Sequence, residues 1–95
     1  MSQIKVEFIS LMVDITGLNE ITLSIENEIT LKDLISKLDD NIGREFTEMI
    51  VDKSGKIFNN VIIVINGERV HSSNLIDITL KGGDTISFIP AIAGG

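Results

Sequence analysis

The stretch Thr30–Gly43, "TLKDLISKLDDNIG", decides the fold because it carries the only long helical pattern in the chain. Its apolar side chains recur at i, i+3, i+4, i+7 and i+11 and so share one stripe of a helix; they are Leu31, Leu34, Ile35, Leu38 and Ile42. Thr30 can accept from the first free N–H groups, with Asp33 three residues on as in a capping box. Gly43 is suited to end the helix. The sequence therefore predicts one main helix with a single buried face.

Two segments before this helix have the period of two that a half-buried strand requires. Residues 4–10, "IKVEFIS", alternate apolar with charged side chains, and residues 20–26, "EITLSIE", alternate apolar with small polar ones. The long connection between them, "LMVDITGLN", contains the turn formers Gly17 and Asn19. We expect the two segments to form a β-hairpin.

The middle of the chain predicts a short helical turn and a second hairpin. "REFTEMIV", residues 44–51, would place Phe46, Met49 and Ile50 on one helical face, and a turn follows at "DKSGK". The run Val61–Ile65, "VIIVI", is β-branched and apolar on both faces, which predicts a strand covered at least in part on both sides. The Asn66-Gly67 pair directly after it is the strongest short hairpin signal in the chain.

The segment "LKGGDTISFIP", residues 80–90, closes the fold. Gly82-Gly83-Asp84 predicts a tight turn that needs positive φ. Ile86 and Phe88 alternate in a final strand, which places the Phe88 ring in the core, and Pro90 marks the exit from that strand.

The predicted order is strand, strand, helix, strand, strand, strand, which indicates an α+β protein with one helix covering a sheet. Because a helical crossover lies between them, the first and last strands can pair in parallel at the centre of the sheet. We expect a β-grasp, or ubiquitin-like, fold: a mixed sheet packed against one main helix. The expected organisation is a single domain over residues 1–95 with a flexible C-terminal tail over residues 90–95.

Composition excludes several classes of function. The 95 residues contain no cysteine, so a disulfide framework, a thiolate metal site and a thiol nucleophile are excluded. A net charge of -6 opposes binding to nucleic acid; it favours either a basic partner surface or simple solubility. The longest apolar run, Val61–Ile65, is far below the ~20 residues that span a bilayer, and "MSQIKVEF" lacks the features of a signal peptide. We therefore expect a cytoplasmic protein that binds neither nucleic acid nor membrane.

The side chains give no strong candidate for catalysis or metal binding. His71 precedes Ser72 and Ser73, but sequence neighbours in a strand or turn point apart, and no carboxylate is placed to orient the ring. The carboxylate pairs are expected to be solvated surface charges; they are Asp39 with Asp40 and Glu26 with Glu28. Gly82-Gly83 lacks the lysine and threonine of a phosphate-binding loop. We expect neither a metal site nor a bound cofactor.

The ending "IPAIAGG", residues 89–95, is different because a turn needs residues on both sides of a glycine pair. An extended arm from Pro90 to Gly95 could reach roughly 20 Å, and glycine leaves the terminal carbonyl carbon unhindered. A carboxylate is a poor electrophile and must first be activated, and we expect adenylation with ATP on a partner enzyme. The chain carries no ATP-binding motif, so we expect a substrate or carrier without catalytic machinery of its own.

At this point the sequence resembles the MoaD/ThiS family of ubiquitin-like sulfur carrier proteins. The likeness covers most of the chain; it includes "IKVEFIS", "ITG", "TLKDLISKL", "VIIVINGERV" and "LKGGDTISFIPAIAGG". Its most specific part combines the Gly83-Asp84 turn, the strand ending in Ile89-Pro90 and the Ala93-Gly94-Gly95 terminus.

The resemblance implies that an E1-like enzyme of the MoeB/ThiF type adenylates Gly95 and that sulfur then replaces AMP to give a C-terminal thiocarboxylate. The implied acceptor is a pterin precursor in molybdenum cofactor biosynthesis, with this chain as the small subunit of a molybdopterin synthase and the large subunit as its partner. The tail and partner-binding residues would be Gly94, Ala93, Ile92, Ala91, Pro90 and Phe88.

Three alternatives stay open at this point. "SLMVDITG" lacks the basic residues common in the small molybdopterin subunit, and the long middle segment and "IPAIAGG" are similar to carriers that feed cysteine biosynthesis. The chain could also be a ubiquitin-like modifier that forms an isopeptide bond through Gly95. In the third alternative it is a β-grasp binding module with an incidental terminus.

Overall fold

A computed structural model describes residues 2–43, 45–71 and 74–90 of the chain. The strands are β1 (Ser2–Phe8), β2 (Glu20–Ile25), β3 (Glu28–Thr30), β4 (Val61–Ile65), β5 (Glu68–Arg69), β6 (Thr79–Lys81) and β7 (Thr85–Pro90). The helices are α1 (Leu11–Thr16), α2 (Leu31–Ile42) and α3 (Glu45–Ile50), and a 3-10 turn, η1, spans Leu75–Asp77.

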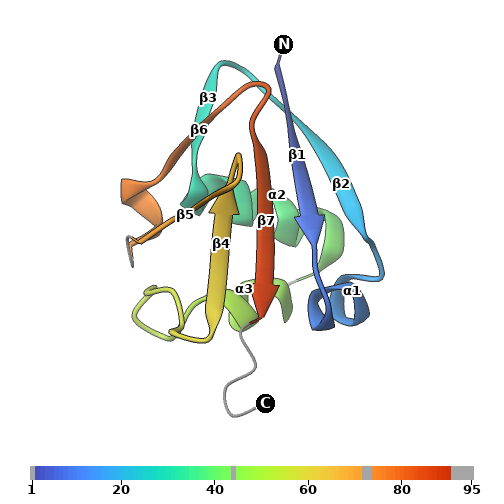
Figure 1. The fold of residues 1–95 in the computed structure, drawn as a ribbon, viewed down its shortest axis with the longest axis vertical. Helices are drawn as coiled ribbons and strands as arrows, with labels where there is room; N and C mark the ends of the chain where they lie inside the picture. Colours follow the sequence, from blue (N-terminus) through green and yellow to red (C-terminus); the bar gives the residue numbers. More distant parts are fainter. Residues whose placement is uncertain (1, 44, 72–73, 91–95) are drawn as a thin grey trace.

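Five strands form one mixed sheet in the order β2-β1-β7-β4-β5, and α2 packs across one face of it (Figure 1). β1 and β2 are the predicted antiparallel hairpin. β1 and β7 run parallel in the middle of the sheet, in a register that pairs Lys5 with Thr85 and Phe8 with Phe88. The predicted β-grasp fold, with its first and last strands paired in parallel, is confirmed.

Helix α2 has the predicted cap and buried face. The Thr30 hydroxyl accepts a hydrogen bond from the Asp33 N–H at 3.2 Å, and the Gly43 N–H donates to the Asp39 carbonyl oxygen at 2.8 Å. The four buried side chains of the helix belong to the predicted stripe; they are Leu31, Leu34, Ile35 and Leu38. Burial of this stripe against the sheet holds the helix in place.

Three phenylalanine rings form the aromatic part of the core. The Phe46 ring lies edge-on to both other rings, with its centroid 5.4 Å from that of Phe8 and 5.0 Å from that of Phe88. The centroids of Phe8 and Phe88 are 6.4 Å apart, and all three side chains are buried. The predicted core position of Phe88 is confirmed, and the cluster ties α3 to the two central strands.

The second predicted hairpin is also confirmed. Asn66 and Gly67 join β4 to β5 with φ values of +52° and +84°, the pair of positive angles that a type I′ turn needs. In β4, Val61 and Ile63 are buried and Ile62 and Val64 are half-buried, so the strand is covered in part on both faces, as predicted.

Two predictions from the sequence are wrong, one at α1 and one at α3. The connection expected to be a turn contains α1, whose Met12 side chain is buried. Its run of adjacent apolar residues hid the helical period. In α3, Phe46 and Ile50 are buried, but Met49, which we placed on the same face, is exposed. Phe46 and Ile50 are four residues apart and align on the core, whereas Met49 lies to one side of that line.

A second, two-stranded sheet was not predicted either. β3 and β6 pair antiparallel, with Ile29 opposite Leu80, and close the fold beside the start of α2. Each strand has three residues, which is too short to show an alternating pattern.

Candidate functional site

The candidate site is built on the end of β7. This strand lies between β1, which is parallel to it, and β4, which is antiparallel. Pro90 is the last residue of β7 and pairs with Val61, so it belongs to the sheet, although we expected the tail to begin there. Proline has no N–H to donate to a neighbouring strand, and at the last residue of β7 this costs the sheet at most one terminal hydrogen bond. The body of the protein therefore positions the chain as far as Pro90.

The predicted tail residues beyond Pro90 lie outside the described residues; they are Ala91, Ile92, Ala93, Gly94 and Gly95. Their assignment as tail and activation site therefore stays a prediction. What the structure describes is the surface from which they depart.

The prediction that Phe88 binds a partner is wrong. We placed it among the tail and partner-binding residues, but its ring is completely buried against Phe8 and Phe46. A side chain without exposed surface cannot contact a partner while the fold is intact. Phe88 acts from inside, by fixing β7 to the core two residues before the strand ends.

Exposed apolar side chains flank the end of β7, and sequence analysis did not single them out. On one side, the Ile9 N–H donates to the Phe88 carbonyl oxygen at 3.2 Å, and Ile9 and Leu11 are 41% and 44% exposed. On the other side, the Val61 N–H donates to the Phe58 carbonyl oxygen at 3.1 Å, and Phe58 is 38% exposed. We call Ile9, Leu11 and Phe58 the exit rim. The sequence feature that could have identified these residues is their apolar character just outside the predicted strands.

The opposite end of β7 is polar and closed by hydrogen bonds. The Asp84 carboxylate accepts the Lys81 N–H at 2.7 Å and the Asn66 amide at 2.9 Å, and Asn66 accepts the Thr85 N–H at 2.9 Å. These donors, the Lys81 N–H first and the Asn66 side chain second, hold the pKa of Asp84 below its usual value. Gly83 has a φ of +94°, as the predicted turn requires. The hydrogen bonds at this end of β7 stabilise the fold.

The other candidates from the sequence form no site. Within residues 2–43, 45–71 and 74–90, no group of three or more histidine, cysteine, aspartate or glutamate side chains could hold a metal ion. His71 is exposed, as are Asp40, Glu26 and Glu28. Asp39 departs from the predicted solvated state, since it is half-buried and accepts a hydrogen bond from the Thr47 hydroxyl.

A family model shows the family to which the chain belongs. The family model described as "ThiS family" matches residues 6–95, from within β1 to Gly95. The chain belongs to the ThiS family. This confirms the resemblance to ubiquitin-like sulfur carriers and places the protein within a group of ubiquitin-like sulfur carriers and modifiers.

Two relatives of this ThiS-family chain have informative names. A "Ubiquitin-related modifier 1 homolog" from Dictyostelium discoideum is 32% identical over 97 residues, covering 98% of this chain and 99% of the relative. A "Putative sulfur carrier protein" from Archaeoglobus fulgidus is 29% identical over 80 residues, covering 83% of this chain and 90% of the relative. The family thus includes names of both kinds, carrier and modifier.

Solved structures agree on the fold. SAMP1 from Haloferax volcanii superposes with a TM-score of 0.78 at 14% identity, covering 98% of this chain and 99% of that one. A "Putative molybdopterin converting factor, subunit 1" from Pyrococcus furiosus gives a TM-score of 0.69 at 22% identity, covering 97% of this chain and all of that one.

Among the helices of the described residues, none is long and apolar enough to cross a membrane.

Proposed function

We propose that this ThiS-family chain is a sulfur carrier whose Gly95 carboxylate is activated and loaded with sulfur. The observation that carries the proposal is the family match, which continues through Gly95 although the last strand ends at Pro90. An extended chain from Pro90 to Gly95 can span roughly 20 Å, enough to carry the carboxylate into the active site of another protein. The exit rim supplies apolar surface for that protein beside the start of the tail.

The proposed chemistry has two steps. First, a Gly95 carboxylate oxygen attacks the α-phosphorus of ATP, pyrophosphate leaves, and an acyl-adenylate forms. Second, hydrosulfide from a sulfur source attacks the acyl carbon, the bond to AMP breaks, and a thiocarboxylate remains. The leaving AMP makes the acyl carbon electrophilic, which the free carboxylate is not.

The catalytic groups for both steps are assigned to a partner, an E1-like adenylating enzyme of the MoeB/ThiF type. ATP would be that enzyme's substrate, and this chain would hold no cofactor. Gly94 has no Cβ, so the last two residues can enter a narrow channel that a larger residue would block. The chain's own contribution is a rigid body, an exposed rim and a terminal carboxylate.

For the acceptor, we propose a pterin precursor in molybdenum cofactor biosynthesis, with this chain as the small subunit of a molybdopterin-synthase-type complex. The thiocarboxylate sulfur would attack a carbon of the acceptor and displace a leaving group from it, and water would then cleave the bond between the Gly95 carbonyl carbon and the sulfur. The sulfur would stay on the acceptor, and the Gly95 carboxylate would be restored. The name of the Pyrococcus furiosus structure supports this acceptor. A carrier for cysteine biosynthesis would use the same two loading steps.

A second candidate function is protein modification. It is favoured by the match to the Dictyostelium discoideum modifier homologue, which covers 98% of this chain at 32% identity. In that reaction a lysine amine attacks the activated Gly95 carbonyl, the leaving group departs, and an isopeptide bond forms. The activated terminus is therefore common to both candidates, and they differ in the nucleophile that receives it.

The experiment that separates the candidates is mass analysis of the C-terminal peptide of protein isolated from its own cells. A thiocarboxylate at Gly95 supports the carrier, and Gly95 joined to a lysine of another protein supports the modifier. Both candidates would be contradicted by two results together. Only a free carboxylate is found at Gly95, and a gene that lacks the codons for Gly94 and Gly95 still supports every function of the intact gene. Pterin and cysteine acceptors are separated by which product a gene deletion fails to make.

A further inference from the structure

The two edges of the five-stranded sheet differ in length and charge. At one edge, β5 has two residues, Glu68 and Arg69, and both are charged and exposed. A very short strand and charged side chains both keep a sheet edge from pairing with another chain. At the other edge, β2 has six residues, and all six pair with β1 in a continuous register. Among the described strands, none pairs with the outer side of β2, which forms the right-hand border of the sheet in Figure 1.

The outer side of β2 presents main-chain hydrogen-bonding groups to solvent. The Phe8 N–H donates to the Asn19 carbonyl oxygen at 2.8 Å, which sets the alternation of bonded and non-bonded pairs in the antiparallel ladder between β1 and β2. It follows that the N–H and C=O groups of Thr22 and Ser24 point away from β1. Both side chains are exposed and uncharged, so this part of the edge has neither the charge nor the proline that commonly protects an edge strand. β2 can therefore accept a further strand.

A hollow of about 570 Å³ adjoins the end of β2 on the side that faces α2. Its lining includes Ser24 and Ile25 from β2, Ile29 from β3 and Lys37 from α2. Side chains of an added strand would alternate between the two faces of the sheet. Those on the helix side would enter this hollow and cover the half-buried Ile29. The site therefore favours a segment in which apolar residues alternate with polar ones.

Charge favours a basic partner over a second copy of the chain. Two copies repel each other because each has a net charge of -6. Residues 17–31, which contain β2 and its flanks, include no lysine or arginine and three carboxylates, those of Glu20, Glu26 and Glu28. Lys5 on β1 pairs with Glu20 at 3.6 Å, whereas Glu26 and Glu28 form no ion pair with another described residue. A basic side chain at that end of an added strand would lie beside two exposed carboxylates.

We propose that β2 binds an extended, basic segment of a partner protein, which joins the sheet as a further strand. The main chain of the segment would exchange hydrogen bonds with Thr22 and Ser24, and its apolar side chains would lie on the helix side, next to Ile29. In this mode of recognition the main chain supplies most of the affinity and alternate side chains supply the selectivity. The site goes beyond the proposed function, because it uses neither the exit rim nor the terminal glycines.

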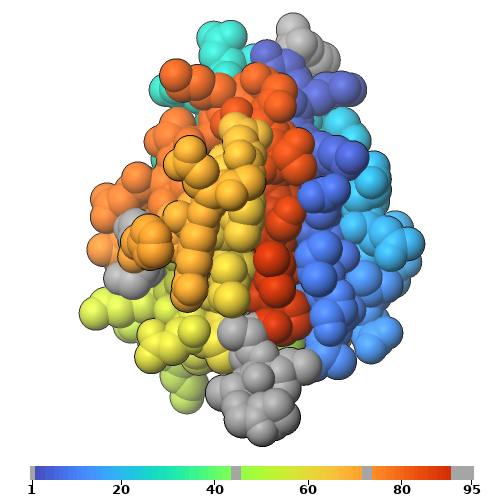
Figure 2. Space-filling model, in the orientation of Figure 1, coloured from blue at the N-terminus to red at the C-terminus, as the bar shows by residue number. Residues whose placement is uncertain are grey.

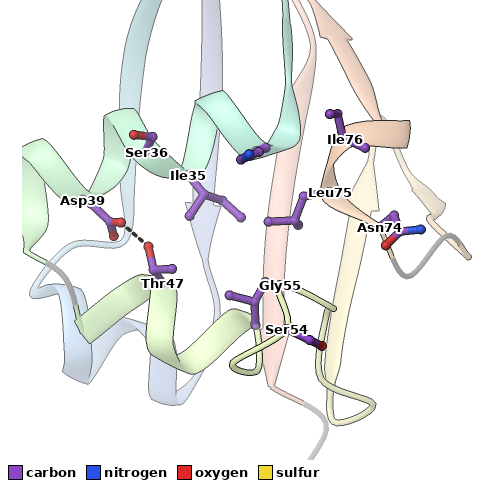
Figure 3. Close-up of a pocket in the computed structure, with 11 residues that line it drawn as sticks. Ile35, Ser36, Asp39, Thr47, Ser54, Gly55, Asn74, Leu75 and Ile76 are labelled. Atoms are coloured by element: carbon purple, nitrogen blue, oxygen red, sulfur yellow. Dashed lines mark hydrogen bonds between the residues drawn. The ribbon is translucent and has the colours of Figure 1, made fainter.

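The test is a titration of the full chain with the peptide Ac-Thr-Val-Lys-Val-Lys-Val-Thr-NH2, followed by backbone amide chemical shifts. We expect saturable shifts at Thr22 and Ser24. We expect none at Thr47 and Leu75, which line a different hollow, between α2, α3 and η1 (Figure 3). No shifts at millimolar peptide, or shifts confined to Thr47 and Leu75, would overturn the proposal.

Methyl groups on the main chain of the peptide test strand pairing directly. The N–H groups of successive residues in a strand point to opposite sides, so one peptide carries N-methyl groups on its valines and a second carries them on its lysines. One of the two should bind roughly tenfold more weakly or worse, because its methyl groups face β2. The other should bind like the unmodified peptide. Equal binding by the two methylated peptides would contradict an added strand.

Matched variants place the binding at the edge of β2. Thr22→Pro removes the outward N–H of residue 22 without removing a hydrogen bond to β1, as for proline on an edge strand. It should weaken peptide binding roughly tenfold or more, whereas Thr22→Val, which keeps the N–H, should bind like the wild-type chain. Equal affinity of the two variants would contradict the site. If Thr22→Pro does not fold, the two methylated peptides give the same reading on the wild-type chain.

Three further arms test the identity of the occupant. The acidic peptide Ac-Thr-Val-Glu-Val-Glu-Val-Thr-NH2 should bind more weakly at low salt, and equal binding would contradict a basic partner. A chain lacking Gly94 and Gly95 should bind the basic peptide as tightly as the full chain; loss of binding would place the site at the tail. Sedimentation of the chain alone should show a monomer. A dimer that disappears in Thr22→Pro would assign the edge to a second copy and overturn the proposal.

Discussion

The two ends of β7 are built from different interactions. At its start, Asp84 and Asn66 satisfy each other and the backbone through hydrogen bonds of 2.7 to 2.9 Å. Next to its end, the segment after β1 carries the exposed side chains of Ile9 and Leu11, and the segment before β4 carries the exposed side chain of Phe58. Figure 2 shows both ends on one face, with β7 in orange to red running between β4 in yellow and β1 in blue.

The difference separates folding from function along a single strand. Polar groups that pair within the chain need nothing from outside, whereas exposed apolar residues gathered at one place are typical of a surface that meets a partner. We therefore expect changes at the start of β7 to alter stability and changes at its end to alter activation. The following predictions test that separation, beginning with the largest effect.

Phe88→Ala should be the most damaging substitution, because it removes a buried ring that contacts both Phe8 and Phe46. We expect a loss of about 3–5 kcal/mol in the free energy of unfolding, measured by urea denaturation. A loss below about 1 kcal/mol would show that the ring is not packed as described.

Gly82→Ala should destabilise the start of β7, because the added Cβ would overlap the Cβ and Oγ atoms of Ser2. We expect a loss of about 1–3 kcal/mol in the free energy of unfolding, the range for an overpacked site. The matched variant is Gly94→Ala, which should keep the wild-type free energy of unfolding and lower the rate of adenylation by the partner enzyme. If the two variants lost stability equally, the separation of roles would fail.

Asp84→Ala should cost about 1 kcal/mol, since it removes a carboxylate that accepts two hydrogen bonds. The pKa of Asp84 is lowered in the folded state, so its stabilisation is complete above the ordinary carboxyl pKa and is lost as the pH falls through the lowered value. Unfolding free energies measured from pH 6 down to about pH 2 should therefore converge for wild type and variant. A difference that grew towards low pH would contradict the sign.

The double substitution Ile9→Ser with Leu11→Ser should have the smallest effect on stability and a clear effect on activation. Both side chains are exposed, so we expect a change within about 0.5 kcal/mol in the free energy of unfolding. The apparent KM of the activating enzyme for the chain should rise if the exit rim contacts it. An unchanged KM would remove the rim from the interface.

Sequence reasoning succeeded where a long periodic pattern met a strong boundary signal. The stripe of α2, its Thr30 cap and the Asn66-Gly67 turn each combine pattern and chemistry, and all are present in the structure. The parallel pairing of β1 with β7 followed from the order of elements, because the crossover allows it.

The other features of the structure depend on tertiary contacts, which a local sequence pattern does not predict. α1 forms because Met12 reaches the core, and β3 pairs with β6 only because the fold brings them together. The same holds for the exit rim and for Asp39, whose neighbour Thr47 is eight residues away on another helix. At the candidate site, the sequence predicted the terminal glycines, and the structure supplied the surface around their point of departure.

The most direct test of the central claim is the intact mass of the chain after incubation with its cognate activating enzyme, ATP and a sulfur source. We predict that one oxygen is replaced by sulfur, that fragmentation places the sulfur on Gly95, and that a chain lacking Gly94 and Gly95 gains no sulfur. An unchanged mass in the presence of an enzyme that adenylates a known family member, or sulfur found on the truncated chain, would contradict it.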